Sequence, residues 1–272
     1  MSLGATLKRV RKQQDRSQKD VATGICAQSM LSAIENDRYT PNAKLLVALC
    51  RRLAISLDEI SLATDFAISG DDDLNTRMQA LCNQHRYQEL RDFLSAPETI
   101  AAVTTAQQTQ AYYYYLGVAQ LHVDAKLDDA KQNLQFAMTM TEERTPTMLT
   151  RLAMASLATV QAKQGLRHSA TQLSDQALAA IEQAPYEENS NIIFYLAALT
   201  AYFLQNATLA TQRLLTGIVY ITAHNSHYML ANSYRLLAEI ADRAGRENEA
   251  TDARQKQQFL TDLFHEQVPK KF

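Results

Sequence analysis

The segment from Ser17 to Glu35 reads SQKDVATGICAQSMLSAIE and holds two short helical patterns with a turn between them. Ser17 has the side chain of a helix N-cap, and Asp20, three positions later, forms an acidic variant of the capping box. Gly24 supplies the backbone freedom that a tight turn requires. After the turn, apolar side chains recur at helical spacing as far as Ile34. The segment therefore predicts two helices joined by a turn.

Further helical patterns lie on both sides of this segment. Apolar side chains at helical spacing predict a helix over residues 3–14. Pro41 precedes an apolar pattern that ends at Leu53, and Ser56 resembles the cap of a further helix. Five short helices in about 65 residues, with a tight turn between the second and third, are typical of a helix-turn-helix domain. In the third helix, Met30 or Leu31 is expected to face inward together with Ile34.

Three stretches carry a family resemblance: SQKDVA, SAIENDRYTP and AISLDEI. They resemble the Xre/Cro-type helix-turn-helix, and the resemblance covers residues 3–62. The segment between Gln18 and Glu35 is one residue shorter than the common pattern. That short form resembles the PlcR branch of the Rgg/PlcR regulators, which sense peptides in Gram-positive bacteria. The resemblance implies a transcriptional regulator that acts as a homodimer on a palindromic operator in double-stranded DNA.

The resemblance also implies which side chains meet DNA. An α-helix fits the major groove, where amide and hydroxyl groups can bind base edges. Ala33 departs from the pattern, because many relatives carry Arg or Lys at this position. The expected base contacts are Gln28, Ser29 and Ser32, and the expected backbone contacts are Gln18, Lys19, Arg38 and Tyr39.

Composition and charge fit this interpretation. The chain has 272 residues with only 7 Gly and 5 Pro, and 46% of the residues are hydrophobic, which favours an all-α fold. Residues 1–52 carry ten basic and four acidic side chains, whereas the remaining residues carry 17 basic and 25 acidic ones. A basic N-terminal part on an acidic body favours a polyanionic partner for the N-terminal part alone.

The rest of the chain repeats with a period of 40 residues. Ala130, Ala170, Ala210 and Ala250 form one column, and a second column contains Val118, Ala158, Ala198 and Ala238. Small residues in such columns let two helices cross closely. The spacing predicts five helix pairs over about residues 73–265, stacked into an α-superhelix with a concave inner surface. We therefore expect a DNA-binding domain at 1–68, a linker at 69–75 (SGDDDLN) and a repeat domain at 76–272.

The repeats resemble degenerate tetratricopeptide repeats, as found in the sensor domains of Rgg/PlcR regulators. This resemblance implies that the inner surface binds a short signalling peptide. Phenols, amides and cations can bind the backbone and the carboxylates of an extended peptide. In the tetratricopeptide register, the inner surface carries Tyr112, Tyr115, His122, Arg151, Lys163, Tyr195, Tyr202, Asn232 and Arg235.

Other classes of function remain as alternatives. No Gly-rich phosphate loop, GxSxG or HExxH motif occurs, and the pair His224 and His227 has no evident further ligands, so we expect neither an enzyme nor a metal or other cofactor. The N-terminus lacks a signal peptide and no apolar run reaches 18 residues, which predicts a cytoplasmic protein without a membrane segment. The repeats could instead bind a protein partner or no ligand, or the chain could be a scaffold that does not bind DNA.

Overall fold

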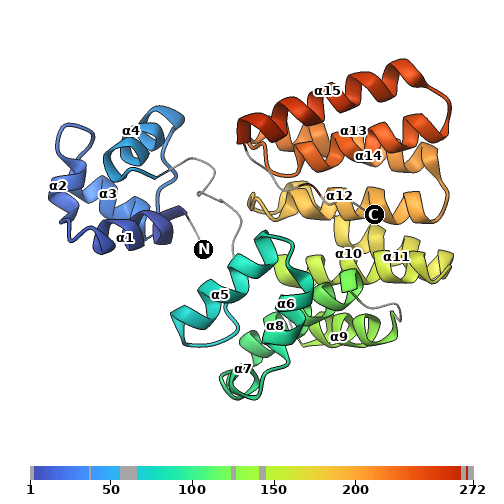
Figure 1. Cartoon of the computed structure of the whole chain (residues 1–272), viewed down its shortest axis with the longest axis horizontal. Coiled ribbons are helices and arrows are strands. Elements are labelled where there is room, and N and C mark those ends of the chain that lie inside the picture. Colours follow the sequence, from blue (N-terminus) through green and yellow to red (C-terminus); the bar gives the residue numbers. More distant parts are fainter. Residues whose placement is uncertain are drawn as a thin grey trace. The chain divides into compact units, whose positions relative to one another are not determined.

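The computed structural model of the chain describes residues 3–36, 38–55, 66–123, 127–140, 145–264 and 268. Every regular element in these ranges is a helix, so the predicted all-α class is confirmed. The chain divides into two compact units, residues 1–65 and residues 66–272. Figure 1 shows the small N-terminal unit in blue and the larger helical unit in cyan to red.

The N-terminal unit contains four helices in its described part, and the tight turn lies between the second and the third. Ser17 and Asp20 form the predicted capping box, and Gly24 adopts a φ of +75° in the turn. Leu31 is fully buried, whereas Met30 is 38% exposed, so Leu31 is the residue that faces inward. The fifth helix predicted from Ser56 lies outside the described residues. The helices are α1 (Leu3–Gln13), α2 (Gln18–Ala22), α3 (Gln28–Glu35) and α4 (Ala43–Leu53).

The C-terminal unit consists of five packed helix pairs, as the 40-residue period predicts. A short helix follows the first pair, and a 3-10 turn, η2 (Ile181–Gln183), follows the third. Each pair contacts the next, for example α6 with α8, α10 with α12 and α13 with α14. The helices are α5 (Asp72–Asn83), α6 (Tyr87–Leu94), α7 (Pro97–Ala101), α8 (Ala106–Val123), α9 (Asp128–Thr139), α10 (Met148–Lys163), α11 (Arg167–Leu178), α12 (Ser190–Phe203), α13 (Ala207–Ala223), α14 (Leu230–Arg243) and α15 (Glu247–Phe264).

The two alanine columns lie where the helices of a pair cross. The first column, Ala130, Ala170, Ala210 and Ala250, is completely buried. In the second column the three alanines are buried and Val118 is half-buried. In the α8–α9 pair the approach is closer still, because a Cβ on Gly117 would lie 2.7 Å from Cγ of Leu134. Small side chains therefore set the distance between paired helices, as the period suggested.

In four of the helix pairs the described turn repeats a left-handed backbone conformation. Positive φ angles occur at His85 (54°), Gly165 (77°), Gln205 (59°) and Gly245 (69°), and neighbouring positions in this series are 40 or 80 residues apart. Glycine adopts this conformation without steric cost, and other residues adopt it at some cost. The repeat is thus more regular in the backbone than in the sequence.

The predicted linker at residues 69–75 is corrected by the structure. Helix α5 already begins at Asp72, capped by the carboxylate of Asp71, which accepts hydrogen bonds from the N–H groups of Asp73 and Leu74. Ser69 and Asn75 are buried, and so is Ile68 before them. The acidic run therefore starts the first helix of the repeats and caps it, a role that its charge alone did not reveal.

Candidate nucleic-acid interface and inner surface of the repeats

Helix α3 presents one exposed polar edge. Its first residues, Gln28 and Ser29, are exposed, and Ser32, one turn later, is half-buried. Leu31 and Ile34, on the opposite side, are buried in the core of the N-terminal unit. Met30 is exposed beside Ser29 and adds an apolar group to the same surface. The side chains predicted for base contacts are therefore free of the core and available at the helix N-terminus.

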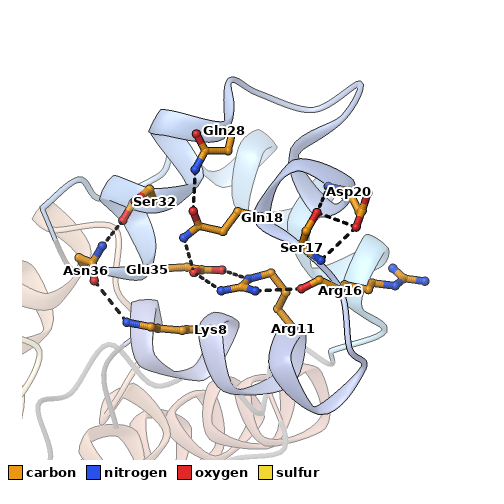
Figure 2. A network of polar contacts seen from close by, with 10 residues as sticks. All are labelled: Lys8, Arg11, Arg16, Ser17, Gln18, Asp20, Gln28, Ser32, Glu35 and Asn36. Atoms are coloured by element: carbon orange, nitrogen blue, oxygen red, sulfur yellow. Dashed lines mark hydrogen bonds and ion pairs between the residues drawn. The ribbon is translucent and has the colours of Figure 1, made fainter.

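A chain of polar contacts holds Gln28 in place (Figure 2). The amide of Gln28 donates a hydrogen bond of 2.6 Å to Oε1 of Gln18, and Gln18 donates one of 2.7 Å to Oε2 of Glu35. Glu35 also accepts two hydrogen bonds from Arg11, at 2.6 and 2.8 Å. A bidentate pair of this kind fixes the orientation of both groups. Gln18, predicted as a contact to the DNA backbone, therefore also orients Gln28, which is predicted to contact a base.

The carboxylate of Glu35 is charged although it is buried. Burial by itself raises the pKa of Glu35, but the hydrogen bonds from Arg11 and Gln18 outweigh burial and hold that pKa below its ordinary value. The Arg11 pKa is raised, mainly by its hydrogen bond to Glu35. The ion pair thus stays formed at neutral pH and connects α1 to α3.

The lowered pKa of Glu35 predicts an acid-sensitive N-terminal unit. Since the folded protein favours the ionised form, the contribution is complete above the unfolded pKa of about 4.3 and is lost as the pH falls through the lower, folded pKa. We expect the urea midpoint of this unit to fall below about pH 4.3. Glu35→Gln should reduce that dependence. The measurement is amide hydrogen exchange in α1–α3, which reports the stability of this unit separately from that of the repeats. An unchanged pH dependence in the variant would show that other carboxylates cause it.

The remaining predicted DNA contacts lie at the surface of the same unit. Lys19, Arg38 and Tyr39 are exposed, Tyr39 by 44%. A second small network lies at the end of α3: Nζ of Lys8 donates to Oδ1 of Asn36, and Nδ2 of Asn36 donates to the backbone oxygen of Ser32. Figure 2 shows both networks around α3. Arg11, Glu35, Lys8 and Asn36 were not predicted, since contacts between residues 24 to 28 positions apart leave no local pattern.

The inner surface of the repeats brings tyrosines from distant helices together. Burial raises the pKa of Tyr87 well above its ordinary value, and nearby groups raise it further: Cys82, Tyr228, Tyr114 and Tyr195. Such effects act over short distances. Tyr87 begins α6, Tyr195 lies in α12, and Tyr228 precedes α14. These tyrosines belong to the first, fourth and fifth helix pairs, so the charges of side chains from distant pairs influence one another.

A column of three stacked rings lies on this surface. The ring of Tyr87 stacks on His122 at a centroid distance of 4.1 Å and on His85 at 5.6 Å. Burial, together with the neighbours Lys163 and His85, lowers the pKa of His122 to about 4. Solvent still reaches the His122 side chain, so the low pKa reflects protein atoms crowded around a concave surface rather than complete enclosure. His122 is therefore an uncharged hydrogen-bonding group at neutral pH.

Three residues predicted to contact a peptide have partners within the fold. The hydroxyl of Tyr112 donates to the backbone oxygen of Leu94 at 3.1 Å. The hydroxyl of Tyr115 accepts from the backbone N–H of Phe66 at 3.2 Å. Arg151 is buried and donates to the backbone oxygens of Ala177 and Ala179, at 2.8 and 2.7 Å. These three side chains therefore hold helix ends and segment ends of the repeat unit, and their contact with a peptide stays a prediction.

Other predicted residues lie along the C-terminal ends of the first helices of successive pairs. Lys163 is exposed, with its Nζ 4.8 Å from the ring centroid of Phe203. The hydroxyl of Tyr202 donates to Oε1 of Glu239 at 3.1 Å. Burial and this hydrogen bond raise the pKa of Tyr202 to about 12. These contacts join neighbouring pairs and leave one edge of Lys163 available to a ligand.

The last group lies deeper in the unit. Tyr195 is buried, and burial raises its pKa, while the charge of Arg235 acts in the opposite direction. Asn232, also in α14, is buried with 7% of its surface exposed. Tyr195, Asn232 and Arg235 thus place a phenol, an amide and a cation on α12 and α14.

Within the described ranges no group of three or more His, Cys, Asp or Glu side chains is arranged to hold a metal ion. Of the described helices, none combines the length and the apolar character needed to cross a membrane.

Comparisons with known proteins agree with this geometry. Residues 7–60 match the family described as Helix-turn-helix. Bacillus thuringiensis PlcR, in complex with the peptide PapR7 and DNA, matches over 97% of this chain and 95% of that chain, with a TM-score of 0.61 and 20% identity. Its apo form matches over the same shares, with a TM-score of 0.57 and 17% identity. No curated protein sequence matches. The chain therefore contains a helix-turn-helix domain at residues 7–60, and as a whole it has the fold of PlcR.

Proposed function

We propose that this protein is a sequence-specific DNA-binding transcriptional regulator whose repeat unit binds a short signalling peptide. The observation that carries the proposal is the combination of two features in one chain. The N-terminal unit holds a helix-turn-helix domain with an exposed, oriented Gln28, and the whole chain has the fold of PlcR, which has been solved with a peptide and DNA. We place the DNA-binding domain at residues 1–65 and the sensor domain at 66–272, where the contacts divide the chain.

The proposed DNA chemistry follows from the exposed edge of α3. Gln28 can pair with adenine in the major groove through both atoms of its amide, and Ser29 and Ser32 can bind several base edges. Gln18, Lys19, Arg38 and Tyr39 would contact phosphates, which adds affinity and salt dependence but no choice of sequence. Because one such domain reads half of a palindrome, we propose a homodimer, acting in the cytoplasm where the DNA lies.

Gln28→Ala is expected to relax sequence selectivity. One lost bidentate contact costs about 1–3 kcal/mol of discrimination at the base pair that it reads. Fluorescence anisotropy with the preferred DNA and with single-base variants measures this difference. Lys19→Ala should instead weaken binding to all sequences alike and reduce the salt slope by about 1. Gln107→Ala, an exposed glutamine in α8, is the matched control. Unchanged selectivity in Gln28→Ala would exclude α3 as the reading helix.

The proposed peptide site lies on the inner surface of the repeats. The predicted members on which this proposal relies are Lys163, Tyr195, Tyr202, Asn232 and Arg235. His122, which the sequence also predicts on this surface, stacks on Tyr87, and Tyr87 stacks on His85. Phenols and an amide can bind an extended backbone, and Lys163 and Arg235 suit a carboxylate.

Isothermal titration of the full chain tests the peptide, with synthetic peptides encoded beside the gene as ligands. A bound peptide should also raise the melting temperature, since it binds the folded state only. If none of these peptides releases heat or raises the melting temperature, the result would favour the alternatives, a protein partner or no ligand. Failure to bind any DNA would instead favour a repeat scaffold. No reaction forms part of the proposal, because the matched domain is a DNA-binding module and not a catalytic one.

A further inference from the structure

Two side chains hold the first residues of the repeat unit. Phe66 is the first described residue after the N-terminal unit, and its N–H donates to the hydroxyl of Tyr115 in α8 at 3.2 Å. The next residues are held by Asn75 in α5. Oδ1 of Asn75 accepts from the N–H groups of Ile68 and Ser69, at 2.9 and 3.3 Å. Nδ2 of Asn75 donates to the backbone oxygen of Ser69 at 3.0 Å.

The side chains that hold residues 66–69 lie in the interior of the repeat unit. Ile68 is completely buried in the core of the repeat unit, and Phe66 packs against the same core. Asn75 and Tyr115 are buried, Tyr115 with 5% of its surface exposed. Buried backbone groups need partners, and this segment has no helix to supply them. The two side chains supply them instead, so the path of residues 66–69 depends on both.

Tyr115 lies in α8, which also carries the exposed His122 predicted on the inner surface. Burial raises the pKa of Tyr115 well above the ordinary value, and the neighbours that raise it further are Cys82, Tyr114 and Tyr228, while the N–H of Phe66 acts in the opposite direction. Tyr228 precedes α14, in the last helix pair, whereas Tyr115 lies in the second pair. The hydroxyl that holds Phe66 is therefore coupled electrostatically to the last pair as well as to its own.

We propose that Tyr115 and Asn75 are positioning residues that fix residues 66–69, the start of the repeat unit after the DNA-binding unit. We propose further that Tyr115 links these residues to the inner surface. The inference rests on the proposed function. A ligand on the inner surface that displaces α8 relative to α5 would change the hydrogen bond from Phe66 without touching the DNA-binding unit. Tyr115 thus transmits the state of the inner surface instead of binding the ligand itself.

The geometry gives the expected effect on DNA binding. A released residue lengthens the connection by up to about 3.3–3.6 Å. One base pair of DNA spans about 3.4 Å. Release of Phe66 and Ala67 would therefore add a reach of about two base pairs. A dimer that holds its two DNA-binding units by longer connections tolerates more spacings between half-sites, because the effective concentration depends less on one distance.

Tyr115→Phe in the full chain removes the hydroxyl and keeps the ring. Tyr112→Phe is the matched control, since it removes a phenol hydroxyl from the same helix that bonds Leu94 and not residues 66–69. Amide exchange at Phe66 should rise about two- to tenfold in Tyr115→Phe, as for the loss of one hydrogen bond, and stay unchanged in Tyr112→Phe. Melting temperatures of both variants establish that the fold is kept.

The DNA probe is the two-half-site sequence that the wild-type chain enriches from a random library, together with copies whose spacing is changed by one or two base pairs. In Tyr115→Phe the preference for the original spacing should fall about threefold or more. Faster amide exchange at Phe66 with an unchanged spacing preference would overturn the proposal that Tyr115 controls the spacing of the DNA-binding units. Unchanged amide exchange at Phe66 would overturn the proposal that Tyr115 holds this residue. If the wild-type chain enriches no DNA, the proposed function is overturned, which is distinct from a failure confined to the variant.

Discussion

Replacing Arg11 by alanine is expected to destabilise the N-terminal unit by about 3–5 kcal/mol. The side chain of Glu35 is completely buried, and that of Arg11 is only 11% exposed. Without Arg11, the carboxylate of Glu35 remains in the interior with Gln18 as its hydrogen-bond donor. A buried charge that loses its partner costs far more than the net strength of the pair. The whole unit depends on this contact, because it joins the first helix to the third.

The measurement for Arg11→Ala is amide exchange in α1–α4 of the full chain, which reports the opening free energy of this unit separately from the repeats. Arg9→Ala is the control, since Arg9 lies on the same helix and bonds only the exposed Gln13. We expect fast exchange in Arg11→Ala and little change in Arg9→Ala. A wild-type exchange pattern in Arg11→Ala would contradict the network described for Figure 2.

Arg151→Ala is expected to destabilise the repeat unit by about 3 kcal/mol, since hydrogen bonds from charged groups contribute about 1.5–3 kcal/mol each. The guanidinium of Arg151 donates to the backbone oxygens of Ala177 and Ala179, at the end of α11. These oxygens are among the helix-end groups that lack a partner within the helix. Burial lowers the pKa of Arg151 and thus opposes its charge, so the two hydrogen bonds also compensate for burial.

Urea unfolding of the full chain, followed in the repeats by amide exchange, measures the effect of Arg151→Ala. Arg167→Ala, at the exposed start of α11, is the control for a lost surface charge. The result distinguishes two roles of Arg151. Lower stability is expected if it holds the end of α11, whereas wild-type stability with weaker peptide binding would restore Arg151 to the ligand site.

The local features of the fold could be predicted because short stretches of sequence determine them. The capping box of Ser17 and Asp20 and the alanine columns depend on residues close together or at a fixed period. Only two of the four left-handed turns carry a glycine from which the sequence could predict them, because the other two positions are His85 and Gln205. There the packing of the pair imposes a conformation that the residue itself disfavours.

The candidate sites could be predicted only in part. Spacing places Gln28 and Ser29 at the start of α3, but the contacts that orient Gln28 run through Gln18 in α2 to Glu35 at the end of α3 and Arg11 in α1. The repeat register likewise predicts on which face of a helix a residue lies. It does not predict whether the side chain already contacts another segment of the fold. For that reason Tyr112, Tyr115 and Arg151 were expected on a ligand surface, whereas backbone groups of Leu94, Phe66 and Ala177 bind them.

The central claim is that the N-terminal unit reads DNA under the control of the repeat unit. The most direct test is enrichment of DNA by the purified full chain from a random-sequence library, followed by titration of the enriched sequence at rising salt. We predict two related half-sites about 34–36 Å apart between centres, and an affinity that falls linearly with salt on logarithmic axes. No enrichment, or equal binding to every sequence, would contradict the claim.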